Sequence, residues 1–158
     1  YLKKFEVSNI KYLGNIKFNG STTITKTSLT TSSKLISSLG SAKINVNIHN
    51  LNDEEKANYI GDIDFTNFNL GSFANTESLG TITSKLNIEG VGFTQNSLEA
   101  KVTGDINSFI FEDYNYQNIT ISGNFKHPLF DGELNIDDPN VKLKFNGLVD
   151  VSILTTPS

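Results

Sequence analysis

The chain has 158 residues and a mass of 17.4 kDa, a length typical of one domain. Its net charge of -4 and pI of about 5.1 argue against a nucleic-acid protein, because binding phosphates requires a clustered basic surface. The absence of cysteine excludes a disulfide scaffold, a thiolate metal site and a cysteine nucleophile. Asn, Ser and Thr are abundant, so the expected surface is polar through amides and hydroxyls more than through charge.

Alternation of apolar and polar residues predicts β-strands along most of the chain. Residues 21–38 are rich in Ser and Thr, and there we expect an edge strand followed by a loose connection. Residues 41–50 alternate cleanly, and residues 52–57 carry the one helical signal, a single turn capped by Asn52. Further strands are predicted over residues 84–90, 98–106, 118–125, 130–136 and 141–151.

Turn signals between these segments are frequent, so the connections are short. Short connections favour antiparallel pairing of consecutive strands, because a parallel crossover needs a dozen or more residues. We therefore expect an all-β domain over residues 1–158, with about nine to eleven mostly antiparallel strands.

Glycine recurs in the apolar phase of several predicted strands, two positions after an apolar residue. Glycine inside a strand marks a bend, a bulge or a close approach to the backbone. A line of such glycines would crease the sheet into an elongated, curled trough with an apolar groove, a β-taco-like form. The predicted crease consists of Gly90, Gly104, Gly123 and Gly147. A β-sandwich or closed barrel also carries corner glycines and remains the alternative.

The apolar phase of the later strands would line this groove. The predicted lining residues are Leu86, Ile88, Val102, Ile106, Ile119, Ile121, Phe125, Leu134, Ile136, Leu143, Phe145, Val149 and Val151.

The sequence contains no catalytic constellation. The two histidines, His49 and His127, lack the spacing of metal ligands, and the carboxylate pair Asp137–Asp138 belongs to an Asp-Pro turn. Phosphate-binding glycine loops, nucleophile elbows and zinc-protease motifs are absent. We expect neither an enzyme nor a bound cofactor or metal.

Four motifs follow one another over residues 59–152. They span residues 59–71, 79–93, 114–123 and 130–150, the last with the pattern F-x-G-x-L-x-I-x-D-P-N-x-x-L-x-F-x-G-x-V-D. In this order they resemble the repetitive β-region of the TamB (translocation and assembly module) family, part of the AsmA-like group, in its Bacteroidetes form. Residues 1–50 match this region only weakly.

The resemblance implies an interior segment of a longer periplasmic protein, anchored in the inner membrane by a part not present here. It implies a conduit for phospholipid acyl chains in outer-membrane biogenesis, with a BamA-type barrel of the outer membrane as partner. Two other functions stay open: an assembly module that docks the barrel by strand addition, and an adhesin-like β-domain. The lipid species and the direction of transport are not given by the sequence.

Overall fold

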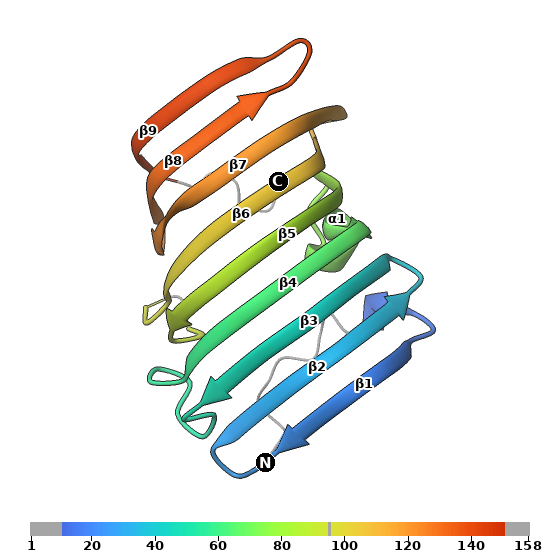
Figure 1. Cartoon of the computed structure of the whole chain (residues 1–158), viewed down its shortest axis with the longest axis vertical. Coiled ribbons are helices and arrows are strands. Elements are labelled where there is room, and N and C mark those ends of the chain that lie inside the picture. Colours follow the sequence, from blue (N-terminus) through green and yellow to red (C-terminus); the bar gives the residue numbers. More distant parts are fainter. Residues whose placement is uncertain (1–10, 95, 151–158) are drawn as a thin grey trace.

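Nine strands form one antiparallel sheet in the computed structural model, which describes residues 11–94 and 96–150 (Figure 1). The strands are β1 (Lys17–Ile24), β2 (Ser28–Ser37), β3 (Gly40–His49), β4 (Asn58–Asn69), β5 (Leu79–Val91), β6 (Glu99–Phe111), β7 (Tyr114–Lys126), β8 (Leu129–Asp137) and β9 (Lys142–Asp150). One short helix, α1 (Leu70–Ala74), lies between β4 and β5.

The order of the strands in the sheet is their order in the chain, β1 to β9, and every neighbouring pair is antiparallel. The predicted all-β class, antiparallel meander and strand number are therefore confirmed. Among the described residues the sheet does not close into a barrel, and no second sheet packs against it as in a sandwich. The alternative folds are thus excluded for this part of the chain.

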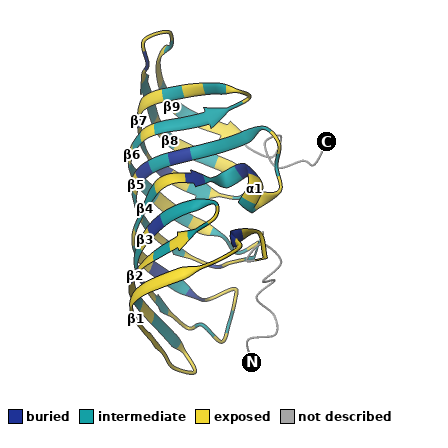
Figure 2. Ribbon diagram, turned by 90° about the vertical axis from the view of Figure 1, so that its right-hand side faces the viewer, coloured by how far each residue is buried: buried dark blue, intermediate teal, exposed yellow. Residues whose placement is uncertain are grey.

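The sheet is curled into a trough (Figure 2). The strands cross the trough, so that its long axis follows the order of the strands (Figure 1). Helix α1 lies on the concave side. Its Leu70 and Phe73 pack against a buried cluster that includes Phe68 and Ile82, so the face bearing this cluster is the inner one.

The sequence analysis does not predict this helix. Asn69 caps its first turn by accepting a hydrogen bond from the backbone N of Ser72 at 2.8 Å. Asn75 ends it in the left-handed conformation at φ 53°. Five residues are too few for a helical periodicity to show in the sequence.

Two predictions for the first half need correction. Residues 21–38 contain the end of β1 and the whole of β2, joined by a tight turn, and not a loose connection. Residues 52–57 form hydrogen-bonded turns and not a helix, and it is the Asp53 carboxylate, not Asn52, that accepts from the backbone N of Glu55. The backbone carbonyl of Asp53 also accepts from the N–H groups of Lys56 and Ala57.

Candidate functional site

The inner face of the trough is built from four rows of directly paired residues that cross all nine strands. Because side chains alternate between the two faces of a strand, residues paired across the sheet share a face. The first row is Phe18, Leu35, Ala42, Phe65, Ser84, Ile106, Ile119, Ile136 and Leu143. The second is Gly20, Ser33, Ile44, Ile63, Leu86, Gly104, Ile121, Leu134 and Phe145.

The third and fourth rows continue the same face toward the other wall. The third is Thr22, Thr31, Val46, Gly61, Ile88, Val102, Gly123, Gly132 and Gly147. The fourth is Ile24, Leu29, Ile48, Tyr59, Gly90, Ala100, Phe125, Phe130 and Val149. From β3 to β9 the second and third rows contain only aliphatic or aromatic residues and glycine.

The structure brings twelve of the thirteen predicted lining residues together in these rows, and Val151 lies outside the described residues. Ile119 is buried, whereas Leu143 and Val149 in the edge strand are exposed at 43% and 40%. The other nine are half-buried. Most of the inner face therefore retains accessible apolar surface, except near Ile106, which packs against the α1 cluster.

The four predicted crease glycines share the inner face but do not lie on one line. Gly123 and Gly147 belong to the third row together with Gly61 and Gly132, whereas Gly104 lies in the second row and Gly90 in the fourth. A single straight crease is therefore wrong. The glycines are spread over a band three rows wide along the trough.

A hollow of about 310 Å³, lined mainly by apolar side chains, opens on the inner face between β2 and β5. Phe93, from the connection after β5, forms part of its rim and stacks on Tyr59 with ring centroids 5.1 Å apart. Burial raises the pKa of the Tyr59 hydroxyl. The hollow is lined by Leu29, Thr31, Ile44, Val46, Ile48, Tyr59, Ile63, Ile88 and Phe93. The site prediction omitted all of these except Ile88, although the alternation of residues 41–50 pointed to three of them.

The middle of the inner face is polar at β1 and β2. There the middle rows carry Thr22, Thr31 and Ser33, whose hydroxyls form a cluster. The Thr31 hydroxyl lies 2.8 Å from those of both Thr22 and Ser33. The N-terminal end of the trough is thus lined by hydroxyl groups, which the sequence analysis did not predict.

The outer face is polar and carries the larger hollow, of about 680 Å³, over β2 to β6. Its charged residues are Asp62, Glu89 and Lys101. The described residues contain no group of three His, Cys, Asp or Glu side chains arranged to hold a metal ion. The residues around this hollow include no such group.

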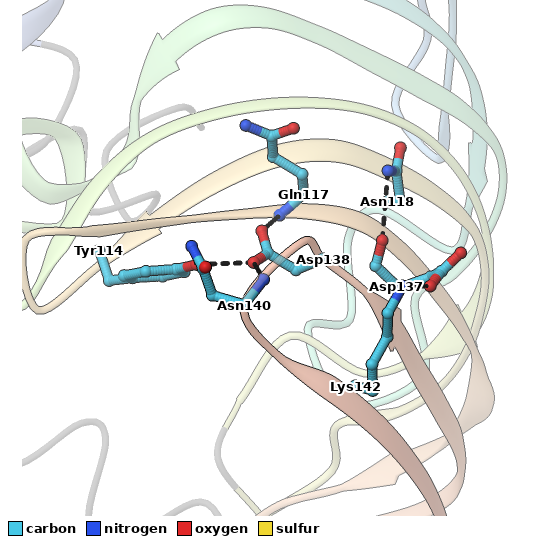
Figure 3. Close-up of polar contacts among 7 residues, drawn as sticks. All are labelled: Tyr114, Gln117, Asn118, Asp137, Asp138, Asn140 and Lys142. Atoms are coloured by element: carbon cyan, nitrogen blue, oxygen red, sulfur yellow. Dashed lines mark hydrogen bonds and ion pairs between the residues drawn. The ribbon is translucent and has the colours of Figure 1, made fainter.

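A polar network joins the start of β7 to the turn between β8 and β9 (Figure 3). Asp138 is almost fully buried and accepts hydrogen bonds from the Tyr114 hydroxyl at 2.6 Å and from the backbone N of Gln117 at 3.0 Å. The backbone N of Asn140 donates to the same carboxylate at 2.9 Å, and the Asn140 side chain donates to the Tyr114 oxygen at 3.0 Å. Beside it, Asp137 forms an exposed ion pair with Lys142.

The hydrogen bond from Tyr114 is the main cause that lowers the pKa of Asp138, with the backbone donors adding to it. The same bond raises the pKa of Tyr114, because the hydroxyl must keep its proton to donate. The "DDPN" segment is therefore a turn whose carboxylate ties β7 to the β8–β9 connection. Both oxygens of the Asp138 carboxylate accept hydrogen bonds from protein donors, consistent with a structural role.

Among residues 11–94 and 96–150, no helix has the length and apolar character needed to cross a bilayer. No protein-family model, no curated protein and no solved structure matches this chain.

Proposed function

We propose that this chain is a segment of a conduit that carries phospholipid between the inner and outer membranes during outer-membrane biogenesis. The observation that carries the proposal is the uninterrupted apolar lining of the two middle rows from β3 to β9 in an open sheet. The TamB-like motifs over residues 59–152 agree with it. The proposal places the chain in the periplasm, in a longer protein anchored in the inner membrane.

An acyl chain supplies the apolar partner that a single curled sheet lacks. Burying methylene groups contributes about 0.8 kcal/mol each, so a 16-carbon chain contributes on the order of 10 kcal/mol before the cost of ordering it. The lining repeats from strand to strand at about 4.8 Å, the spacing of strands in a sheet. Because no polar residue interrupts the middle rows from β3 to β9, a sliding chain meets a nearly uniform surface.

Lipid that copurifies with the chain tests this function. We expect native mass spectrometry of protein isolated under mild conditions to show bound phospholipid. Ile121→Asp places a carboxylate in the middle of the second row and should abolish the lipid-bound mass, because an acyl chain cannot solvate the charge. Phe145→Glu, two strands along the same row, should do the same.

The matched control is Asn124→Asp, three residues along β7 on the outer face, where the side chain is exposed and its cross-strand neighbours are Lys101 and Asp131. This variant should retain the lipid. Lipid-free wild-type protein, or equal lipid in Ile121→Asp and Asn124→Asp with both folded, would contradict the conduit. Circular dichroism of each variant shows whether the sheet is intact.

A second candidate function is docking of a BamA-type barrel by strand addition. The exposure of the edge strand β1 favours it. All eight residues of β1 are exposed, and among the described residues this strand pairs only with β2. An edge strand of this kind offers backbone donors and acceptors to another strand. A thiol-reactive cross-linker on Thr23→Cys should then capture the purified barrel, and the same linker on Lys85→Cys in the central strand β5 should not.

A further inference from the structure

Hydrogen-bonding side chains stand at one place only in the two middle rows of the described inner face. Thr22 in β1 and Thr31 in β2 belong to the third row, and Ser33 in β2 belongs to the second. From β3 to β9 these rows contain only aliphatic or aromatic residues and glycine. The polar part of a bound molecule therefore finds side-chain partners on the middle rows only at this hydroxyl cluster.

The hydroxyl cluster has a proton to offer to an outside acceptor. Its three hydroxyls carry three protons, and the two contacts of Thr31, at 2.8 Å to Thr22 and to Ser33, use two of them. The remaining contacts, between Thr22 and Ser33 and to the carbonyl of Ser21, are 3.4 Å or longer, beyond the usual length of a hydroxyl hydrogen bond. Ser33 is buried and Thr22 is exposed, so a bonded chain from Ser33 through Thr31 leaves the proton of Thr22 available.

The hollow of about 310 Å³ on the inner face begins at the same cluster, because Thr31 is one of its lining residues. The hollow extends from β2 to β5, which is three strand spacings or about 14 Å along the trough. Past Ile88, at its far end, the third row continues with Val102 and Gly123. A chain of methylene groups that starts at Thr31 thus meets apolar surface from β3 onward.

The acceptor that suits this cluster is an uncharged one. None of the four rows of the described inner face contains a charged residue. Phosphate groups are typically bound by Arg or Lys, whereas an ester carbonyl needs only a neutral donor such as a hydroxyl. In a phospholipid the ester carbonyls are part of the acyl groups, so a carbonyl at the cluster brings the acyl chain to the hollow.

We propose that Thr22, Thr31 and Ser33 bind an ester carbonyl of a phospholipid whose acyl chain occupies the adjoining hollow. This inference rests on the proposed function and adds what this end of the trough recognises, which is the ester linkage of the lipid and not its headgroup. The cluster is then a holding position for the polar part of the lipid, and the apolar rows lead from it toward β9.

Competition between an ester lipid and an ether lipid tests the recognition of the carbonyl. Dipalmitoylphosphatidylcholine and its dihexadecyl ether analogue share headgroup and chain length, but only the first carries ester carbonyls. Native mass spectrometry of the chain with an equimolar mixture resolves the two complexes by mass. We expect the ester complex to exceed the ether complex about two- to tenfold, the range that one hydrogen bond provides.

Thr31→Val removes the central hydroxyl and keeps the branched shape of the side chain. The ester complex should fall to the level of the ether complex, which should itself stay as in the wild type. Thr31→Ser retains a hydroxyl and should retain the preference. The matched control is Thr30→Val, since Thr30 is the exposed neighbour on the outer face, and this variant should bind both lipids like the wild type.

The outcomes separate this inference from the conduit. Equal ester and ether complexes in the wild type, or a preference that persists in folded Thr31→Val, would overturn the role of the hydroxyls while the bound lipid still supports the conduit. Absence of both complexes would contradict the conduit and this inference with it. A second mixture, of phosphatidylcholine and phosphatidylglycerol with the same ester chains, should give similar amounts of both complexes. A strong preference there would mean that the headgroup is recognised instead.

Discussion

Two buried serines on the inner face differ in whether their hydroxyls have partners. Ser33 is 5% exposed and its Oγ lies 2.8 Å from the Thr31 hydroxyl. Ser84 is 1% exposed, and its Oγ has no hydrogen-bond partner. A buried hydroxyl that has lost water without gaining a partner is a cost to folding.

Replacing each serine by alanine should therefore change stability in opposite directions. We expect Ser84→Ala to raise the free energy of unfolding by about 1 kcal/mol and Ser33→Ala to lower it by about 1 kcal/mol. Urea denaturation followed by circular dichroism measures both. A loss of stability in Ser84→Ala would show that its hydroxyl has a partner, such as a water molecule.

Protonation of Asp138 makes the stability of the fold depend on pH in the acid range. Because its pKa is lowered in the folded state, the ionised carboxylate stabilises the protein above the ordinary pKa of about 3.9. That stabilisation disappears as the pH falls through the lowered pKa. Asp138→Asn should unfold at lower urea concentration than the wild type at neutral pH, and the two midpoints should converge in acid. Midpoints that stay equally far apart at every pH would contradict this assignment.

The titration of Tyr114 reports the same hydrogen bond to Asp138. Its pKa is raised chiefly by the hydrogen bond to Asp138, so removing that carboxylate should move the titration of Tyr114 to lower pH. The near-ultraviolet absorbance of tyrosinate measures the titration, and Tyr114→Phe identifies its contribution among the five tyrosines. An unchanged titration in Asp138→Asn would show that the bond is not made in solution.

At the scale of the elements, glycines on the inner face let the strands follow the curl. Gly104 in β6 and Gly147 in β9 have φ angles of 150° and 155°, which residues other than glycine rarely adopt. They differ in their surroundings. A Cβ on Gly104 would collide with the backbone carbonyl of Lys85, whereas the nearest atom to one on Gly147 is the Phe145 ring at 3.6 Å.

Alanine substitutions at these two glycines separate the energetic cost of backbone strain from that of a steric collision. Gly147→Ala carries the strain alone and should cost about 1 to 2 kcal/mol of unfolding free energy. Gly104→Ala adds a collision with a neighbouring strand and should cost clearly more, enough to disturb the β5–β6 pairing. Urea denaturation of both variants gives the comparison. Equal losses would mean that the sheet relaxes around Gly104 without cost.

The strands that the sequence predicted well are those with apolar inner residues. From Leu86 onward, alternation alone identified the face and twelve lining residues that the register brings together. It could not give the register, so it placed glycines of three different rows on one crease. In β1 and β2 the inner positions carry Thr22, Thr31 and Ser33, and a strand with hydroxyls on both faces shows no alternation.

At the scale of the whole molecule, the described fold is a single sheet, whereas most domains bury their core between two packed layers. Only eight hydrophobic side chains are buried among the described residues, and three of them, Leu13, Phe68 and Ile82, form the cluster under α1. The stability of the trough therefore depends largely on strand pairing, and on whatever covers its inner face. The open edges, the apolar lining and the thin core are three consequences of the same architecture.

Calorimetry should reveal this architecture without any ligand. The heat capacity change of unfolding follows the apolar area newly exposed, and compact domains give about 12–15 cal/mol/K per residue. Because the trough already exposes much of its lining when folded, we expect the lipid-free chain to fall below that range. Loading with phospholipid covers the lining in the native state, so the heat capacity change should rise and the melting temperature should increase.

Ile121→Asp, which keeps the sheet but cannot accept an acyl chain, should show the low value with and without lipid. A lipid-free value typical of a compact domain would mean that the inner face is closed in solution, and the conduit would then lack its accessible surface.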